Sequence, residues 1–216
     1  MRLAVIVGMK TEAALLPPGI RVGCSGGLPA RAEFLARQFL AEGAEALLSF
    51  GIAGGLDPAL KPGDLLVAGT VQSRGGSYTA DRIWSARLRM ALPEARNATI
   101  AGSDTVAASA AEKRALYQQG NGAVDLESGA VARVAAEAGK PFAILRAVAD
   151  PADRQLPRSV AVGLAPDGST RALAVVGQLV LRPWELGGLI RVGLDSQAAL
   201  KALGDAVKVV GLTLGV

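Results

Sequence analysis

Short apolar runs alternate with helical segments as far as Asp150, and this alternation limits the fold more than any other feature of the sequence. Leu3–Val7 is a continuous apolar run with the length of a strand buried on both faces. The stretch 28–43 has helical periodicity and stops at Gly43, and strand-like and helix-like stretches then alternate up to Val148. This order predicts an α/β fold with a mixed, mostly parallel central sheet flanked by helices.

Length and composition narrow the class of protein. The 216 residues contain no internal repeat or linker, so we expect a single domain over residues 1–216, mainly helical from about Leu156. The net charge is +4, but the cations are spread along the chain, which argues against a nucleic-acid partner. Cys24 is the only cysteine, the N-terminal apolar run is too short for a signal peptide, and no apolar stretch reaches membrane-spanning length. We therefore predict a cytoplasmic protein.

The sequence contains no histidine. This excludes Ser-His and Cys-His nucleophile pairs and His-dependent metal sites, so acid–base chemistry has to come from Asp, Glu, Lys, Tyr or the substrate. The Gly-x-Gly-x-x-Gly spacing of dinucleotide-binding folds and the P-loop pattern are also missing from the chain. We expect neither a metal nor an organic cofactor.

Polar or glycine-rich stretches follow several of the predicted strands. These stretches are Gly8–Glu12, Ser25–Gly27, Gly51–Gly55, Gly102–Thr105 and Asp150. Ligands of open α/β sheets bind beyond the carboxyl ends of the strands, so we expect the binding site at this edge. The glycines of "GIAGG" (Gly51–Gly55) would let the backbone come close to a ligand, which makes Gly54 and its neighbour Ile52 candidates for substrate binding. The structural alternative is a tight strand-to-helix turn packed on the sheet.

Three motifs, in order and spacing, resemble one family. "GMKTEAALL", "SFGIAGGLDPALKPGDLLVA" and "AVDLESGAVARVAAEAGKPFAILRAVADPAD" resemble the superfamily of purine nucleoside phosphorylases and methylthioadenosine/adenosylhomocysteine nucleosidases. The resemblance extends from Arg2 to Asp153 and implies a nucleoside phosphorylase-like fold, a small-molecule nucleoside substrate and a homo-oligomer. The tail, with "LPRSVAVGLAPDGSTRALAVVGQLVLRPWELGGLIRVGL", is similar to the hopanoid-associated phosphorylases, which act on adenosylhopane.

The resemblance gives Glu127 a role at the sugar. Cleavage of an N-glycosidic bond builds positive charge on the ribose, and a carboxylate that accepts both the 2′ and 3′ hydroxyls holds the sugar and favours the cationic transition state. The family carries this acid in a triplet before a helix, here Asp125-Leu126-Glu127. The structural alternative is that Glu127 is an N-terminal helix acid stabilised by the helix dipole.

The same resemblance places Asp150, in "RAVAD", beside the leaving base. A purine leaves more easily when N7 is protonated, and a half-buried acid can donate or share that proton. The implied base is adenine. The structural alternative is a loop aspartate that caps the next element.

Other positions of the family motifs complete the candidate site. Glu12 would activate water in a hydrolytic enzyme and line the sugar site in a phosphorolytic one. Leu126 and Val106 would form apolar walls, and Asp104 would lie near the base. The chain departs from the family at Ile52 and Ala149, where relatives often carry a hydroxyl. The change at Ile52 leaves the nucleophile open, and the change at Ala149 removes a possible hydroxyl neighbour of Asp150.

Phosphorolysis would need cations for inorganic phosphate as a co-substrate. The candidates are Lys10, Arg31 and Arg74, each near a predicted loop at the site edge, and each is equally compatible with an ordinary surface charge. Phosphorolysis and hydrolysis therefore both remain open.

The apolar tail allows two interpretations. It is either a core helix pair with an oligomer interface, or a wall for a lipid-linked substrate with contact to the membrane surface. Together with the motifs, this predicts an enzyme that cleaves a 5′-substituted adenosine, adenosylhopane above all, within hopanoid biosynthesis. The alternatives are a methylthioadenosine/adenosylhomocysteine nucleosidase, a purine nucleoside phosphorylase, and a non-catalytic nucleoside-binding domain.

Overall fold

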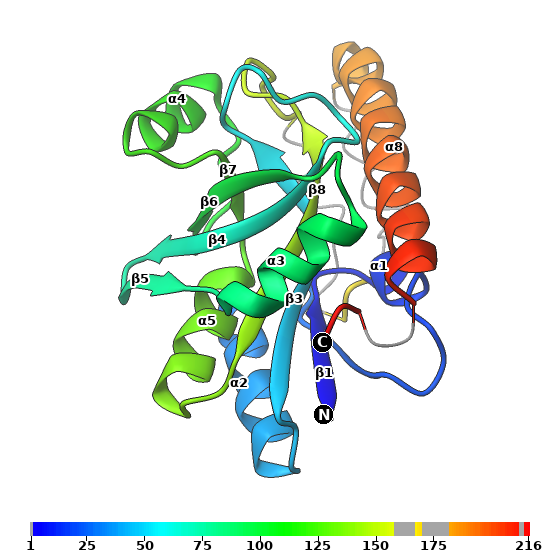
Figure 1. The fold of residues 1–216 in the computed structure, drawn as a ribbon. Coiled ribbons are helices and arrows are strands. Elements are labelled where there is room, and N and C mark those ends of the chain that lie inside the picture. The colour runs from blue at the N-terminus through cyan, green and yellow to red at the C-terminus, as the bar shows by residue number, and fades with distance from the viewer. Residues whose placement is uncertain (1, 158–166, 170–181, 212–213) are drawn as a thin grey trace.

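The computed structural model describes residues 2–157, 167–169, 182–211 and 214–216, and it has eight strands in one sheet (Figure 1). The strands are β1 (Leu3–Val7), β2 (Arg21–Cys24), β3 (Ala46–Gly55), β4 (Leu65–Ser73), β5 (Gly76–Thr79), β6 (Arg96–Gly102), β7 (Ala123–Asp125) and β8 (Phe142–Asp150). Their order is β2-β1-β3-β7-β6-β4-β5, and β8 pairs with both β3 and β4.

The double pairing of β8 closes part of the sheet into a ring. β8 runs parallel to β3 and antiparallel to β4, so β3, β7, β6, β4 and β8 follow one another around a closed path. The pairs β1–β2, β1–β3, β3–β8, β4–β6 and β6–β7 are parallel, and β3–β7, β4–β5 and β4–β8 are antiparallel. The predicted single-domain α/β fold with a mixed, mostly parallel sheet is confirmed.

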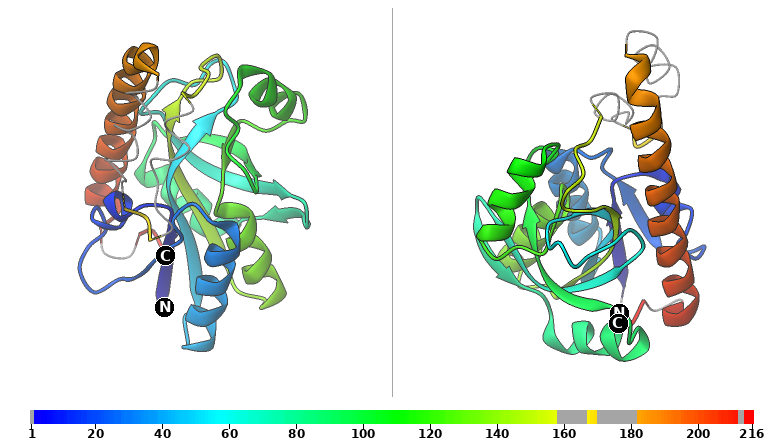
Figure 2. Two further views of the ribbon diagram at one scale, coloured as in Figure 1. Left: turned by 180° about the vertical axis from the view of Figure 1, so that it is seen from behind. Right: turned by 90° about the horizontal axis from the view of Figure 1, so that it is seen from above.

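Helices cover both faces of the sheet (Figures 1 and 2). They are α1 (Lys10–Ala13), α2 (Pro29–Ala41), α3 (Arg82–Ala91), α4 (Ala110–Gln118), α5 (Ser128–Glu137), a 3-10 turn (Pro183–Glu185) and α8 (Leu186–Val210). One apolar core lies between the sheet and α2 with α5, and a second lies between the sheet and α3 with α8. The small residues Ala32 and Ala36 of α2 and Ala132 and Ala135 of α5 let these helices approach the strands closely.

The structure corrects the prediction at the glycine-rich "GIAGG" stretch. We expected a strand followed by a turn, but β3 continues through Gly55 and keeps its pairing with β8. Gly51 has φ +149°, a conformation that side-chain-bearing residues rarely adopt, and the register shifts between Ala53 and Gly54. The glycines therefore bend a strand instead of ending it.

Smaller differences concern short elements and the tail. β5 and β7 were not predicted because four- and three-residue strands carry little periodicity. α3 begins at Arg82, before the predicted Ser85, because Asp81 caps it by accepting from the Trp84 N–H at 2.8 Å. Most of the tail motif used for the hopanoid resemblance falls in 158–166 and 170–181, outside the described residues. Among the described helices, none has the length and apolar character needed to cross a bilayer.

Candidate functional site

A fully buried arginine stands at the centre of the candidate site. Arg146 lies in the middle of β8, whose residues are all buried. Its Nη2 donates to Ser49 Oγ at 2.7 Å and to Glu127 Oε2 at 3.2 Å. Its Nε lies 2.7 Å from Asp125 Oδ2, an ion pair whose N–H is not directed at the oxygen. The guanidinium of Arg146 on β8 therefore contacts both acids of the "DLE" triplet, Asp125 and Glu127.

Glu127 is held from three sides. It occupies the N-cap position of α5 without capping the helix through its side chain. Instead, Oε1 accepts from Ser25 Oγ at 2.9 Å and Oε2 accepts from Arg146. The end of β1 adds a backbone wall, since a Cβ added to Gly8 would lie 3.0 Å from Oε1. The sequence-based alternative of a helix-dipole acid is incomplete, because a tertiary network holds the carboxylate.

Glu12 joins the same cluster from α1. Its Oε2 accepts from the backbone N–H groups of Gly8 and Met9, each at 2.8 Å, and its Oε1 accepts from the Ile52 N–H at 2.8 Å. Gly51 makes room for this arrangement, because a Cβ there would lie 2.5 Å from Glu12 Oε1 and 2.7 Å from Arg146 Nη1. The carboxylate of Glu12 therefore ties the end of β1 to the middle of β3.

The cluster carries more acids than bases. Asp125, Glu127 and Glu12 surround the single guanidinium of Arg146, and all four side chains are buried. Burial raises the pKa of Glu127 to about 7, the charges of Asp125 and Glu12 act in the same direction, and Arg146 opposes them. Burial also raises the pKa of Glu12, again against the charge of Arg146. Such a site is suited to a ligand that becomes positively charged.

Asp150 lies at the end of β8 and is paired with a lysine. Lys113 of α4 forms an ion pair with Asp150 Oδ2, and its Nζ also donates to the Pro151 carbonyl at 2.8 Å. Both carboxylate oxygens lie against Gly54, where an added Cβ would be 3.4 Å from Oδ1 and 3.5 Å from Oδ2. Burial raises the pKa of Asp150, and the positive charge of Lys113 acts in the opposite direction.

β3 relates the two acidic centres. Gly51 is level with Arg146 and touches the Glu12 side, while Gly54 is level with Asp150. Three residues of extended strand span about 10 Å, which is comparable to the length of a nucleoside. Residues from distant parts of the sequence thus meet at two points along one strand.

The remaining candidates occupy less central positions. Ile52 contributes its backbone, because its N–H donates to Glu12 and its carbonyl accepts from Arg146 Nη1 at 3.4 Å. Leu126 is partly buried between the two acids of the triplet, and Val106 is 48% exposed in the loop before α4.

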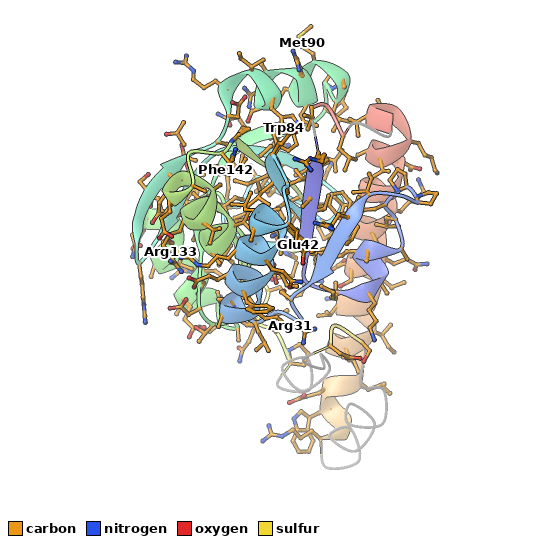
Figure 3. All side chains as sticks on the ribbon, turned by 90° about the horizontal axis from the view of Figure 1, so that it is seen from below. Arg31, Glu42, Trp84, Met90, Arg133 and Phe142 are labelled. Atoms are coloured by element: carbon orange, nitrogen blue, oxygen red, sulfur yellow. The ribbon has the colours of Figure 1, made fainter. Side chains whose placement is uncertain are left out.

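The three predicted phosphate ligands lie outside the buried cluster. Lys10 pairs with Asp167 at 2.6 Å, and Arg74 pairs with Asp104 at 3.2 Å, with both partners of each pair exposed. Arg31 is exposed on α2 (Figure 3). The structure therefore brings Glu12, Glu127, Ile52 and Gly54 together near Asp150, but not these cations.

Sequence reasoning gave no role to several members of the site, although Ser25 lies in a stretch expected at the binding edge and Asp125 lies in the triplet with Glu127. These members are Arg146, Asp125, Ser25, Ser49, Ser128 and Lys113. A usable signal existed for Arg146, since a charged residue inside the apolar run "FAILRAVA" has to find buried partners. Lys113 gave no signal, because a lysine in an amphipathic helix is normally exposed.

Metal-binding clusters and cavities were the other features that could mark a site. Within the described ranges, no three Cys, Asp or Glu side chains are arranged to hold a metal ion. Two cavities of about 380 and 390 Å³ border α4. Neither cavity is lined by Glu12 or Glu127. The second is lined by Ala110, Arg114, Pro151 and Ala152 among others, so it flanks the Lys113–Asp150 pair.

A family comparison agrees with this geometry. The family model described as the phosphorylase superfamily matches residues 7–182, which contain every element of the cluster. The chain belongs to this superfamily. A search of curated proteins found no sequence that matches this chain.

Solved structures share the superfamily fold. An S-adenosylhomocysteine nucleosidase from Streptococcus pyogenes, in complex with 5-methylthiotubericidin, is 17% identical, with a TM-score of 0.68 over 96% of both chains. A mutant futalosine hydrolase of Helicobacter pylori is 18% identical, with a TM-score of 0.68 over 95% of this chain and 98% of its own. A mutant Helicobacter pylori MTAN with 5′-methylthioadenosine in its active site is 18% identical, with a TM-score of 0.68 over 96% of this chain and 98% of its own. At these identities the similarity concerns the fold.

Proposed function

We propose that this protein is an enzyme that cleaves the N-glycosidic bond of a nucleoside. One observation carries the proposal: three buried carboxylates surround one guanidinium about 10 Å along β3 from a fourth buried acid, Asp150. Breaking the bond between the sugar and the base makes the sugar cationic and leaves the bonding electron pair on the base. A site with excess negative charge near the sugar and a polar group near the base stabilises that charge separation.

Glu127 is the proposed sugar ligand. Each of its oxygens already accepts one hydrogen bond, from Ser25 and from Arg146, and each keeps a further acceptor position. Two adjacent ribose hydroxyls can therefore donate to the two oxygens without breaking these contacts. The missing side chain of Gly8 leaves the space that the Glu127 carboxylate itself occupies.

Asp150 is the proposed group at the base, and adenine is the proposed base. Oδ1 is the oxygen available for a base N–H, since Oδ2 is engaged by Lys113. Val106 and Leu126 remain proposed apolar walls, and Asp104 a proposed neighbour of the base.

Water is the proposed nucleophile. A phosphate dianion would be repelled by the acidic cluster, and two of the three candidate phosphate ligands, Lys10 and Arg74, are ion-paired with carboxylates at the surface. Glu12 uses three acceptor positions on backbone N–H groups, and a carboxylate has about four, so one remains for a water molecule. Phosphorolysis is the alternative, with phosphate as co-substrate.

The 5′ group of the substrate is a finer proposal. Trp184, Leu186, Ile190 and Leu194 are exposed near the start of α8, and the last three recur every fourth residue on one helix face. This apolar face supports a large apolar 5′ substituent such as that of adenosylhopane, in hopanoid biosynthesis and at the membrane surface of a cytoplasmic enzyme. It equally supports a homo-oligomer. The structural neighbours instead favour methylthioadenosine, adenosylhomocysteine or futalosine as the substrate.

Base release tests the function. Purified protein is incubated with adenosine, methylthioadenosine, adenosylhomocysteine and an adenosine bearing a long apolar 5′ group, with and without phosphate, and the free base is measured by chromatography. Release that is independent of phosphate supports hydrolysis, and release that requires phosphate supports the phosphorolytic alternative. Tight binding without release from any substrate would instead support a nucleoside-binding domain. Glu137→Gln, an exposed change on the same helix as Glu127, is the control for nonspecific effects.

A further inference from the structure

Lys113 is the one fully buried lysine among the described residues, and the proposed function does not yet explain it. Its side chain is 0% exposed, although it lies on α4, a helix whose other charged residues face outward. Lysine is almost never fully buried unless it is paired, because removing an ammonium from water is costly. The structure therefore requires a strong reason for this position.

The helix that carries Lys113 is fixed at its beginning. Ser109 and Glu112 form a reciprocal capping box, in which Ser109 N donates to Glu112 Oε2 at 2.9 Å and Glu112 N donates to Ser109 Oγ at 3.2 Å. Leu156 N donates to the Ala108 carbonyl at 2.8 Å and ties the loop after β8 to the start of α4. These contacts hold Lys113 against the end of β8.

The contacts of Lys113 select one oxygen of Asp150. Nζ pairs with Oδ2 and donates to the Pro151 carbonyl, so two of its three protons are directed at the chain segment that carries the acid. Oδ1 is not engaged by Lys113, and both oxygens lie beside Gly54 on β3. A carboxylate held by one oxygen has a fixed orientation, and its other oxygen is presented in a defined direction.

The charges around Asp150 all favour its ionised form. Lys113 and Arg154 are the described residues whose charges act on it, and Arg154 itself pairs with Asp195 of α8. Gly54 of β3 lies beside the carboxylate, Val124 of β7 lies beside Gly54, and neither residue titrates. Burial works in the opposite direction by raising the pKa of Asp150. Without Lys113, the cation in direct contact with this carboxylate would be lost.

We infer that Lys113 is a positioning residue of the glycosidic cleavage, which keeps Asp150 a carboxylate and presents its Oδ1 to the base as a hydrogen-bond acceptor. This inference rests on the proposed function. Asp150 then accepts the N–H of a base protonated at N7 by solvent, rather than supplying that proton itself. The C1′–N9 bond breaks with its electron pair on the base, water forms the new C1′–O bond and releases one proton, and Asp150 ends as it began.

The test compares Lys113→Met and Lys113→Arg with Lys201→Met, a change at an exposed lysine of α8. The kcat for base release is measured from pH 5 to 9.5, and circular dichroism checks that each variant is folded. Carbon-13 spectra of aspartate carboxyls, assigned with Asp150→Asn, report the titration of Asp150 independently of turnover. We expect Lys113→Met to lower kcat at pH 7 by about 10²-fold, to shift the titration of Asp150 upward, and to shift the acid limb of kcat with it. Lys113→Arg should keep the wild-type limb.

Two failures are distinguishable. If wild-type protein releases no base from any nucleoside, the proposed function is wrong and Lys113 has no role in that reaction. If wild-type protein releases base but folded Lys113→Met keeps both the wild-type pH profile and the wild-type titration of Asp150, the positioning role is overturned while the function stands. If Lys113→Met does not fold, Lys113→Arg decides: an unshifted acid limb and titration support the role, and a shifted one contradicts it.

Discussion

Arg146 Nη2 lies 3.2 Å from Glu127 Oε2, in a cluster where three carboxylates meet one guanidinium. When all three carboxylates are ionised, the cluster carries more negative than positive charge. A buried excess of negative charge destabilises the folded protein, and it becomes useful when a cation forms beside it. This relationship makes opposite predictions for stability and activity.

Glu127→Gln should separate the two properties. Removing the negative charge should lower kcat by about 10²–10³-fold, because the charge stabilises a cationic sugar only in the transition state. The same change should raise the melting temperature at pH 8, since Arg146 keeps Asp125 as its partner. Steady-state kinetics and thermal melts measure both effects. A variant that is less stable than wild type and equally active would contradict the assignment, and Glu137→Gln should change neither quantity.

The pH dependence should follow Glu127. Its pKa is about 7 in the folded protein, so kcat/KM should rise between pH 6 and 8 as the carboxylate forms. Stability should change in the opposite direction. The folded state binds this proton more tightly than the unfolded state, whose pKa is near 4.5, so the free energy of unfolding should fall as pH rises from about 4.5 to 7. Glu127→Gln should remove most of this fall in denaturant titrations, and an unaltered slope would refute the attribution.

Arg146→Met should unfold or strongly destabilise the protein. The variant leaves Asp125, Glu127 and Glu12 buried without their shared cation, and breaking a buried ion pair from one side costs about 3–5 kcal/mol. Urea titration measures the loss. Arg37→Met, which removes an exposed arginine paired with Glu33 and Glu137, is the matched control and should cost less than about 1 kcal/mol.

Gly51→Ala tests the bent part of β3. An alanine at φ +149° is strained, and its Cβ would collide with Glu12 Oε1 and Arg146 Nη1. We expect a loss of about 1–3 kcal/mol together with a clear loss of activity. Gly187→Ala in α8 is the control, because nothing lies within 4 Å of its added Cβ and the residue is helical, so stability should stay equal or rise.

Asp150→Asn removes the negative charge at the proposed base site. The amide keeps the shape but accepts a base N–H more weakly, so kcat should fall by about 10²–10⁴-fold. The amide also leaves the ammonium of Lys113 without an anionic partner. Kinetics on a folded variant decide the matter, and a near-normal rate would rule out a role of Asp150 in releasing the base.

The general fold could be predicted from the sequence because its signals are local. Continuous apolar runs such as Leu3–Val7 and Phe142–Val148 identify buried strands, and glycines such as Gly43 identify helix ends. The closed ring could not be predicted, because it depends on β8 pairing with β4 across about eighty residues of intervening chain, and pairing of this kind leaves no periodic trace. The continuation of β3 through Gly55 was missed for the same reason.

The candidate site was predictable only in part. Glu12, Glu127 and Asp150 lie in motifs with fixed spacing. The structure places Glu12 beside Gly51 and Asp150 beside Gly54 of β3, and Glu127 beside Gly8. Their partners come from elsewhere in the chain. Lys113 is buried because the end of β8 and the loop after it fold over α4, and nothing in the helix sequence encodes that contact. A search for charged residues inside apolar strands would have found Arg146 but not Lys113.

The closed strand ring also restricts how copies of this chain can associate. Within the described sheet, only β2 and β5 are paired on a single side, and each has four residues. So little unpaired backbone gives another chain almost no opportunity to add a strand. Any assembly of subunits would have to form through helices and loops, where side-chain complementarity selects the partner, and uncontrolled growth by strand addition is disfavoured.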